Sequence, residues 1–74
     1  MTNKDWEAEV GGVLSSERVS WRTSSCWCDE AGSTGWAELT HVGNGKSKTV
    51  SVSLDRYSTA AERRAEILRQ LHER

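Results

Sequence analysis

The sequence contains no proline and no phenylalanine, and its leucine, isoleucine and valine residues number only twelve among 74. A chain this short forms at most one domain and buries a limited fraction of its surface. Disordered chains of similar composition usually carry a high net charge, whereas the formal charge here is −1. Four tryptophans supply the missing apolar bulk. We therefore expect residues 1–74 to form a single small domain with a core built around tryptophan.

Long apolar segments are absent as well. No run approaches the roughly 18 residues that a membrane-spanning helix requires. The opening stretch MTNKDWEAEVGG is polar and acidic, unlike a secretory signal. These features predict a cytoplasmic protein without a membrane partner, and in that compartment its two cysteines are expected to be thiols.

Charge is distributed unevenly along the chain. Residues 1–40 contain three Lys or Arg against seven Asp or Glu, and residues 41–74 contain seven against four. Nucleic-acid-binding modules are usually clearly basic, so only the C-terminal half has this character, and modestly. Four cations of this half could contact phosphates, and the alternative is that they belong to a solvated hairpin tip and helix face. They are Lys46, Lys48, Arg56 and Arg63.

The N-terminal segment has the pattern of a capped helix. Thr2 followed by Asp5 is a possible capping box. At helical spacing, one narrow side collects the apolar residues Trp6, Val10, Val13 and Leu14. A short strand with alternation over residues 6–10 is the competing interpretation, and we favour the helix.

From residue 19 the pattern changes to the two-residue period of β-strands. We predict strands over residues 19–28, 36–42 and 48–54, with Asn44-Gly45 as a two-residue hairpin loop. In the first strand, one face would carry Val19, Trp21, Thr23, Ser25 and Trp27, and the other Ser20, Arg22, Ser24, Cys26 and Cys28. In the hairpin, Leu39 would face Val50 and Ala37 would face Val52, forming one apolar patch.

This register predicts the surroundings of the tryptophans and the cysteines. Trp21 and Trp27 would lie in the core, with Cys26 and Cys28 on the polar face and His41 on the opposite side from the thiols. A C-x-C pair on a strand matches neither the spacing of a structural zinc site nor the geometry of a disulfide. A Cys–His nucleophile would need the two groups within hydrogen-bonding reach. We therefore expect no metal, no cofactor and no enzymatic activity.

The C-terminal segment predicts a second helix. Thr59 and Glu62 form another capping box. The apolar stripe consists of Ala60, Ala61, Ala65, Ile67, Leu68 and Leu71, and the outward side of Glu62, Arg63, Glu66, Arg69, Gln70 and Glu73. Arg64 falls inside the apolar stripe. It either extends past the core to water or packs on a tryptophan or an acid from the N-terminal half.

These elements predict an α+β fold of order α-β-β-β-α, in which both helices cover one face of a three-stranded antiparallel sheet. This order and length resemble the double-stranded RNA-binding domain, and the last four elements resemble the sheet-plus-helix arm domains of integrases. The resemblance implies a nucleic-acid-binding module. No functional residue carries over, because the second helix opens with Ser58-Thr59-Ala60-Ala61-Glu62 where the RNA-binding family has lysines, and no Gly-Pro-x-His loop exists.

We expect a small protein-interaction module, such as an inhibitor or accessory factor of phage or mobile-element type. The alternative is a nucleic-acid-binding module. The sequence does not decide whether the protein forms a homodimer. The expected contact residues lie on the sheet face left uncovered: Arg22, Trp36, Glu38, Thr40 and Ser51. Trp36 is the expected anchor, since tryptophan is enriched in interface hot spots. In the alternative, Trp36 folds over the sheet edge onto the loop of residues 29–35.

Overall fold

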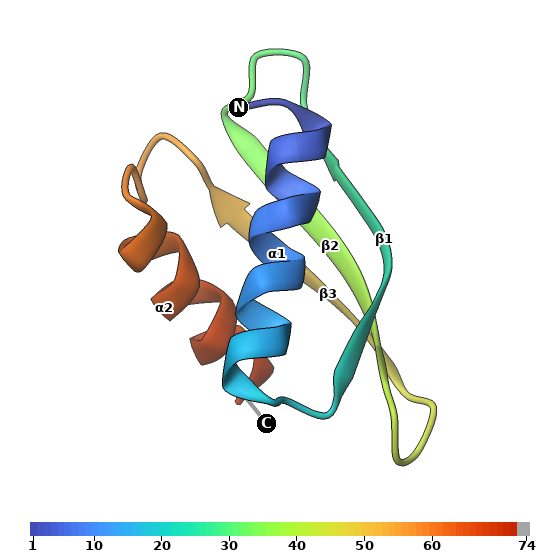
Figure 1. Cartoon of the computed structure of the whole chain (residues 1–74). Coiled ribbons are helices and arrows are strands. Elements are labelled where there is room, and N and C mark those ends of the chain that lie inside the picture. Colours follow the sequence, from blue (N-terminus) through green and yellow to red (C-terminus); the bar gives the residue numbers. More distant parts are fainter. Residues whose placement is uncertain (73–74) are drawn as a thin grey trace.

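A computed structural model describes residues 1–72. Its elements are α1 (Asn3–Glu17), β1 (Trp21–Cys28), β2 (Thr34–His41), β3 (Ser47–Ser53) and α2 (Ala60–Leu71). The strands form an antiparallel sheet in the order β1-β2-β3, and both helices lie on the same side of it (Figure 1). The predicted α+β class and element order are confirmed. Neither described helix has the length and apolar character that crossing a bilayer would require.

Helix α1 forms as its capping pattern predicts. The hydroxyl oxygen of Thr2 accepts a hydrogen bond from the backbone N–H of Asp5 at 3.1 Å, which satisfies one free amide of the first turn. The buried side consists of Trp6, Val10, Val13 and Leu14, as the helical spacing predicts. The helix ends at Arg18, which adopts the left-handed conformation with φ of 51°.

The hydrophobic core lies between the helices and the sheet, and it is centred on Trp6. Among the described residues, the largest fully buried side chains are Trp6, Leu39, Ile67, Val10, Val50 and Val52. The two tryptophans that the sequence predicts in the core, Trp21 and Trp27, are less buried than expected. Trp21 is half-buried at the margin of the core, whereas Trp27 is 38% exposed. The prediction of a core position for Trp27 is therefore wrong.

A β-bulge in β1 explains the error. Thr23 lies opposite Leu39, whereas Ser25 lies opposite Glu38, so that Ser24 is an additional residue in β1. One additional residue reverses the direction of every later side chain in the strand. The regular alternation predicted over residues 19–28 holds only for the part of the strand before the bulge.

Beyond the bulge, the cysteines and the tryptophan exchange faces. Cys26 and Cys28 point toward the helices and pack against the core, half-buried. Trp27 points away from the helices. The predicted position of both cysteines on the polar face is therefore wrong, for the same reason as the predicted position of Trp27.

The β2–β3 pairing keeps its predicted faces but not its predicted register. Ala37 lies opposite Val50 and Leu39 opposite Lys48, a shift of two residues from the expected pairs. A shift by an even number leaves each side chain on its own face. The apolar patch of Ala37, Leu39, Val50 and Val52 is accordingly buried as predicted.

The loop between these strands accounts for the shift. The backbone N–H of His41 donates to the carbonyl of Lys46 at 2.7 Å, which leaves residues 42–45 as a four-residue connection. A two-residue type I′ turn needs positive φ at both central positions. Gly45 has φ of 71°, but Asn44 does not adopt a positive φ, so the expected turn does not form.

Helix α2 begins with the predicted cap but buries a different side. Thr59 accepts from the backbone N–H of Glu62 at 3.2 Å. Ile67 and Leu71 are buried and Leu68 is half-buried, as expected. The predicted stripe is wrong at Ala60, Ala61 and Ala65, which are exposed. The predicted outward side is wrong at Glu66, which is buried, and at Arg63 and Gln70, which are half-buried. Glu73, expected on that outward side, lies outside the described residues.

Two ion pairs connect the helices. The guanidinium of Arg63 binds Glu9 with two hydrogen bonds of 2.8 Å, and Arg64 pairs with Glu17. The interpretation that Arg64 pairs with an acid from the N-terminal half is confirmed. Both pairs place acids of the N-terminal half against bases of the C-terminal half, so the uneven charge of the sequence is partly neutralised within the fold.

Candidate functional site

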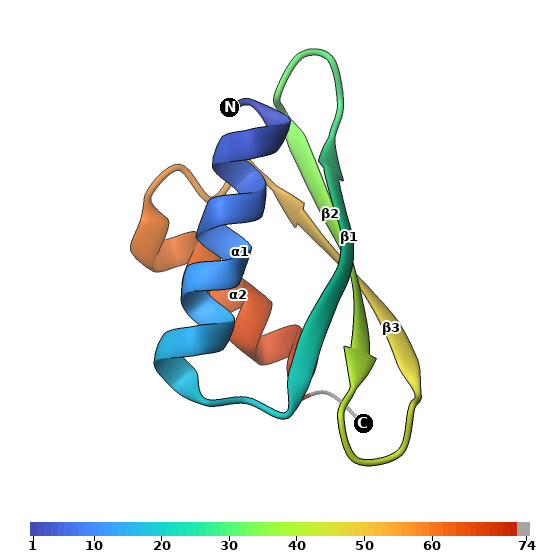
Figure 2. The ribbon, with the colours of Figure 1, turned by 45° about the vertical axis from the view of Figure 1, so that its right-hand side comes forward.

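The sheet face turned away from the helices is not covered by any of residues 1–72 (Figure 2). We call it the open face. Strand alternation and the bulge assign to it Arg22, Ser24, Ser25 and Trp27 of β1, Thr34, Trp36, Glu38 and Thr40 of β2, and Ser47, Thr49, Ser51 and Ser53 of β3. The five contact residues expected from the sequence, Arg22, Trp36, Glu38, Thr40 and Ser51, are all in this set.

A pair of stacked tryptophans is the main apolar feature of the open face. Trp27 lies directly opposite Trp36 in the β1–β2 register. Their ring centroids are 6.2 Å apart and their planes are inclined by 17°. Because β2 is the central strand, Trp36 stands inside the sheet and packs on Trp27 instead of folding over an edge.

Sequence reasoning found Trp36 but missed Trp27. The difference lies in the bulge, which moves Trp27 to the open face. No residue in the segment 23–25 signals a bulge, because this type of bulge does not depend on glycine. The tryptophan pair is therefore a property of the folded sheet that strand periodicity does not predict.

The polar part of the open face carries one cation and one anion. Arg22 and Glu38 are both exposed, and no ion pair joins them within the described part of the chain. The hydroxyl groups of Ser24 and Thr40 are hydrogen-bonded to each other at 2.8 Å across β1 and β2. The charge of the surface is therefore balanced, with each sign available to a partner.

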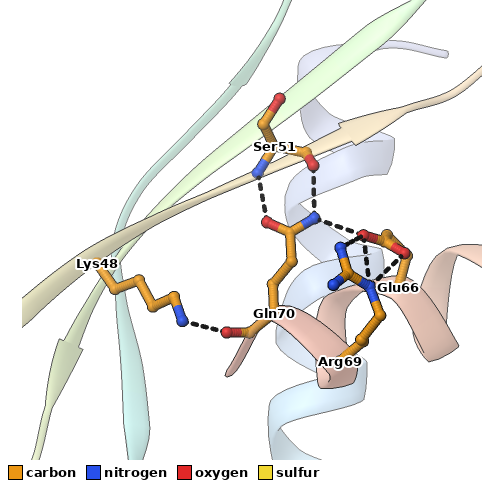
Figure 3. A network of polar contacts seen from close by, with 5 residues as sticks. All are labelled: Lys48, Ser51, Glu66, Arg69 and Gln70. Carbon is orange, nitrogen blue, oxygen red and sulfur yellow. Dashed lines mark hydrogen bonds and ion pairs between the residues drawn. The ribbon is translucent and has the colours of Figure 1, made fainter. Parts of the chain in front are cut away.

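The free edge of β3 is occupied by a side chain from α2. The amide of Gln70 accepts from the backbone N–H of Ser51 at 3.1 Å and donates to its carbonyl at 2.7 Å (Figure 3). Lys48 donates to the backbone carbonyl of Gln70 nearby. Gln70 thus bonds to the edge in the way that a neighbouring strand would, which prevents another strand from pairing at this position.

Glu66 stabilises this arrangement from within α2. Its carboxylate accepts from Nε of Arg69 at 3.1 Å and from the amide of Gln70 at 2.9 Å (Figure 3). These hydrogen bonds, chiefly those from Arg69, lower the pKa of the Glu66 carboxyl to about 2, although burial acts in the opposite direction. Glu66 is therefore ionised at neutral pH and holds Gln70 in the orientation that covers β3.

The outer edge of β1 is closed at one end by the start of α1. The side-chain oxygen of Asn3 accepts from the backbone N–H of Cys28 at 2.7 Å, and the thiol of Cys28 donates to the carbonyl of Met1 at 3.5 Å. Further along, the bulge at Ser24 interrupts the regular edge. Bulges and side-chain caps are both devices that keep edge strands from pairing with other chains.

The cysteines and His41 lie apart from each other on the side of the sheet that faces the helices. Partial burial and, secondarily, the negative charge of Glu7 raise the pKa of the Cys26 thiol. His41 faces the helices like the thiols, contrary to the predicted opposite side, but it packs edge-on against Trp21 at 5.0 Å. It lies four residues along β2 from Ala37, the partner of Cys26, or about 13 Å in an extended strand. Residues 1–72 contain no cluster of three or more potential metal ligands.

The four cations considered for phosphate contact do not gather on one surface. Lys48 is bonded to Gln70, and Arg63 to Glu9 and the carbonyl of Tyr57. Lys46 precedes β3 and Arg56 follows it, and a strand of this length spans roughly 20 Å. Arg56 also lies over the ring of Tyr57, 5.6 Å from its centroid. Three of these charges are thus engaged within the fold, and Lys46 and Arg56 lie at opposite ends of the sheet.

Comparison of this chain with protein-family profiles, curated proteins and solved structures found no match. Its function is therefore inferred from the chemistry of its own surfaces, because a fold alone does not specify a function.

Proposed function

We propose that this protein is a small non-enzymatic interaction module that binds another polypeptide through the open face. The observation that supports this is the stacked pair of Trp27 and Trp36, partly exposed on an otherwise Ser- and Thr-rich sheet. Tryptophan and arginine are enriched among the residues that dominate binding energy, and small polar neighbours exclude water around them. Arg22 on the same face fits this composition.

The sheet edges are less suitable than the open face. Gln70 bonds to the backbone of Ser51 on β3, and Asn3 bonds to that of Cys28 on β1. A peptide that joined either edge as a new strand would have to displace these side chains. The open face needs no such rearrangement.

Nucleic-acid binding is the second candidate, and the tryptophan pair is the observation that favours it. Bases stack on exposed aromatic rings without regard to sequence. Such surfaces also need cations that follow the phosphate backbone, and binding then weakens steeply as salt is added. On the open face Arg22 is accompanied by Glu38, which favours a polypeptide over a polyanion.

The finer assignment is an inhibitor or accessory factor of phage or mobile-element type, acting in the cytoplasm. Its support is the small size of the chain and its two free cysteines, which suit a reducing compartment.

Site-specific photo-crosslinking tests the proposal. A photoreactive residue replaces either Thr49, on the open face, or Ala65, exposed on α2, in lysate of the source cells with and without nuclease. We expect nuclease-resistant adducts with a polypeptide from position 49, lost in a Trp36→Ala background, and none from position 65. Adducts from position 65 alone, or adducts from position 49 that Trp36→Ala leaves unchanged, would contradict the proposal. Nuclease-sensitive adducts would indicate the second candidate.

A further inference from the structure

The open face has apolar side chains at both of its ends. Trp27 is 38% exposed at one end, beside Trp36. At the other end Val42 is 56% exposed. The backbone N–H of Val42 donates to the carbonyl of Ser20 at 2.8 Å, which continues the β1–β2 pairing one step past β2. Alternation then places Val42 on the open face, like Trp36 and Glu38.

The two charges lie between these apolar ends. Along β2 from Trp36, Glu38 comes next, then Thr40 with Arg22 beside it, and then Val42. Successive positions on one face are about 6–7 Å apart. The order along the face is therefore aromatic, negative, positive and aliphatic.

This order is complementary to itself when reversed. Two such sheets can be stacked about a two-fold axis that lies between them, perpendicular to the strands, at a level midway between Glu38 and Thr40. Rotation about this axis reverses the direction of β2. Trp36 of one copy then faces Val42 of the other. Glu38 faces the level of Thr40, where the long side chain of Arg22 from the neighbouring strand reaches it. Each contact occurs twice, as in any two-fold interface.

We propose that the open face binds a second copy of this chain in a symmetric, face-to-face dimer. This inference rests on the proposed function, because it names the partner of the same surface. Two antiparallel sheets packed in this way form a sandwich, and the covered edges of β1 and β3 stop the assembly at two chains.

The size of the face sets the expected strength. Three strands of this length make a face about 14 Å wide and about 25 Å long. That is smaller than the roughly 800 Å² per partner of a standard stable interface. The dimer is therefore expected to dissociate on dilution, with its two ion pairs fixing the relative orientation more than the affinity.

Charge reversal with mixing is the decisive experiment. Analytical ultracentrifugation over a concentration series measures the dimer of the unchanged chain, of Arg22→Glu, of Glu38→Arg and of their equimolar mixture. Each variant alone places like charges across the axis twice, so self-association should weaken at least tenfold. In the mixture both contacts join opposite charges, and dimers should reappear. Arg56→Glu makes the same charge change as Arg22→Glu but lies outside the open face, and it should dimerise like the unchanged chain.

Three outcomes would overturn the dimer: an unchanged chain that stays monomeric at all concentrations, single variants that dimerise normally, or a mixture that stays monomeric. Photo-crosslinks from position 49 to a different polypeptide would then still support the proposed function. Crosslinks without dimers would therefore remove only the dimer, whereas absence of both dimers and crosslinks would remove both proposals.

Discussion

The indole ring of Trp6 lies directly against the backbone of Gly35, so closely that a β-carbon at Gly35 would be 2.6 Å from Cε2 of Trp6. The same indole donates from Nε1 to the carbonyl of Trp36 at 2.8 Å. The buried tryptophan of α1 thus fixes the part of β2 that presents Trp36 on the other face. Packing in the core and geometry of the candidate binding surface are coupled through these adjacent residues.

Substituting Gly35 by alanine should destabilise the fold. The new methyl group would overlap the Trp6 ring, and overpacking of this kind costs about 1–3 kcal/mol. Gly12→Ala is the matched control, because nothing lies within 4 Å of a β-carbon there and the residue is inside α1. It should stabilise by about 0.5–1 kcal/mol. Urea denaturation followed by circular dichroism compares the two, and a Gly35→Ala protein as stable as the unchanged chain would contradict the contact.

The tryptophans should differ sharply in their contribution to folding. Trp6→Ala removes the centre of the core and should cost about 3–5 kcal/mol, enough to unfold so small a domain. Trp27→Ala should remain folded and melt cooperatively, losing about 0.5–1.5 kcal/mol of stacking with Trp36. Thermal denaturation by circular dichroism measures both. An unfolded Trp27→Ala protein would show that Trp27 belongs to the core.

Glu66 should make stability depend on acid pH. The carboxyl has a lower pKa in the folded chain, about 2, than its ordinary value of 4.5. The unfolded chain therefore binds the proton more readily, and the stabilisation is complete above about pH 4.5 and declines as pH falls toward 2. Denaturant midpoints at pH 7 and pH 3 should differ less for Glu66→Gln than for the unchanged chain. Equal differences in the two proteins would refute this role.

Removing the amide of Gln70 should expose the edge of β3. Gln70→Leu keeps an uncharged side chain of similar size but loses both hydrogen bonds to Ser51, at a cost of about 0.5–1.5 kcal/mol, because water hydrates the freed backbone groups of this exposed edge. We also expect aggregation that rises with concentration, measured by light scattering, since an uncovered edge pairs with other strands. Ala65→Leu adds a leucine at an exposed site on the same helix. If it aggregates equally, added hydrophobicity and not the edge would be the cause.

The features predicted correctly from sequence are those that local interactions determine. Thr2 and Thr59 cap their helices through residues three positions away. The apolar faces of β2 and β3 follow from alternation, which survives a register shift of two. Alternation likewise predicts Glu38 and Trp36 on one face, together with Arg22, which precedes the bulge in β1.

The features that were not predicted depend on contacts distant in sequence. The bulge at Ser24 lets Cys26 and Cys28 pack under α1 while Trp27 stacks on Trp36, a choice that no residue near the bulge encodes. Helix α2 lies along the edge of the sheet, so the flank bearing Glu66 meets the backbone of β3. The rotation of α2 about its own axis is set by this position beside the sheet, and the amphipathic pattern of the helix alone does not predict it.

The bulge also lets strand β1 accommodate a change in chain length. Deletion of Ser24 would remove the additional residue and leave a regular ladder with the same partners, so Trp27 would still lie opposite Trp36 and the thiols of Cys26 and Cys28 would still face the helices. Regular pairing of the strand with Ser24 retained would instead send Trp27 to the side of the helices. A one-residue deletion at the bulge is therefore expected to preserve both surfaces of the sheet, as are length changes confined to the loop of residues 42–45, which leave the pairing of β1 with β2 intact.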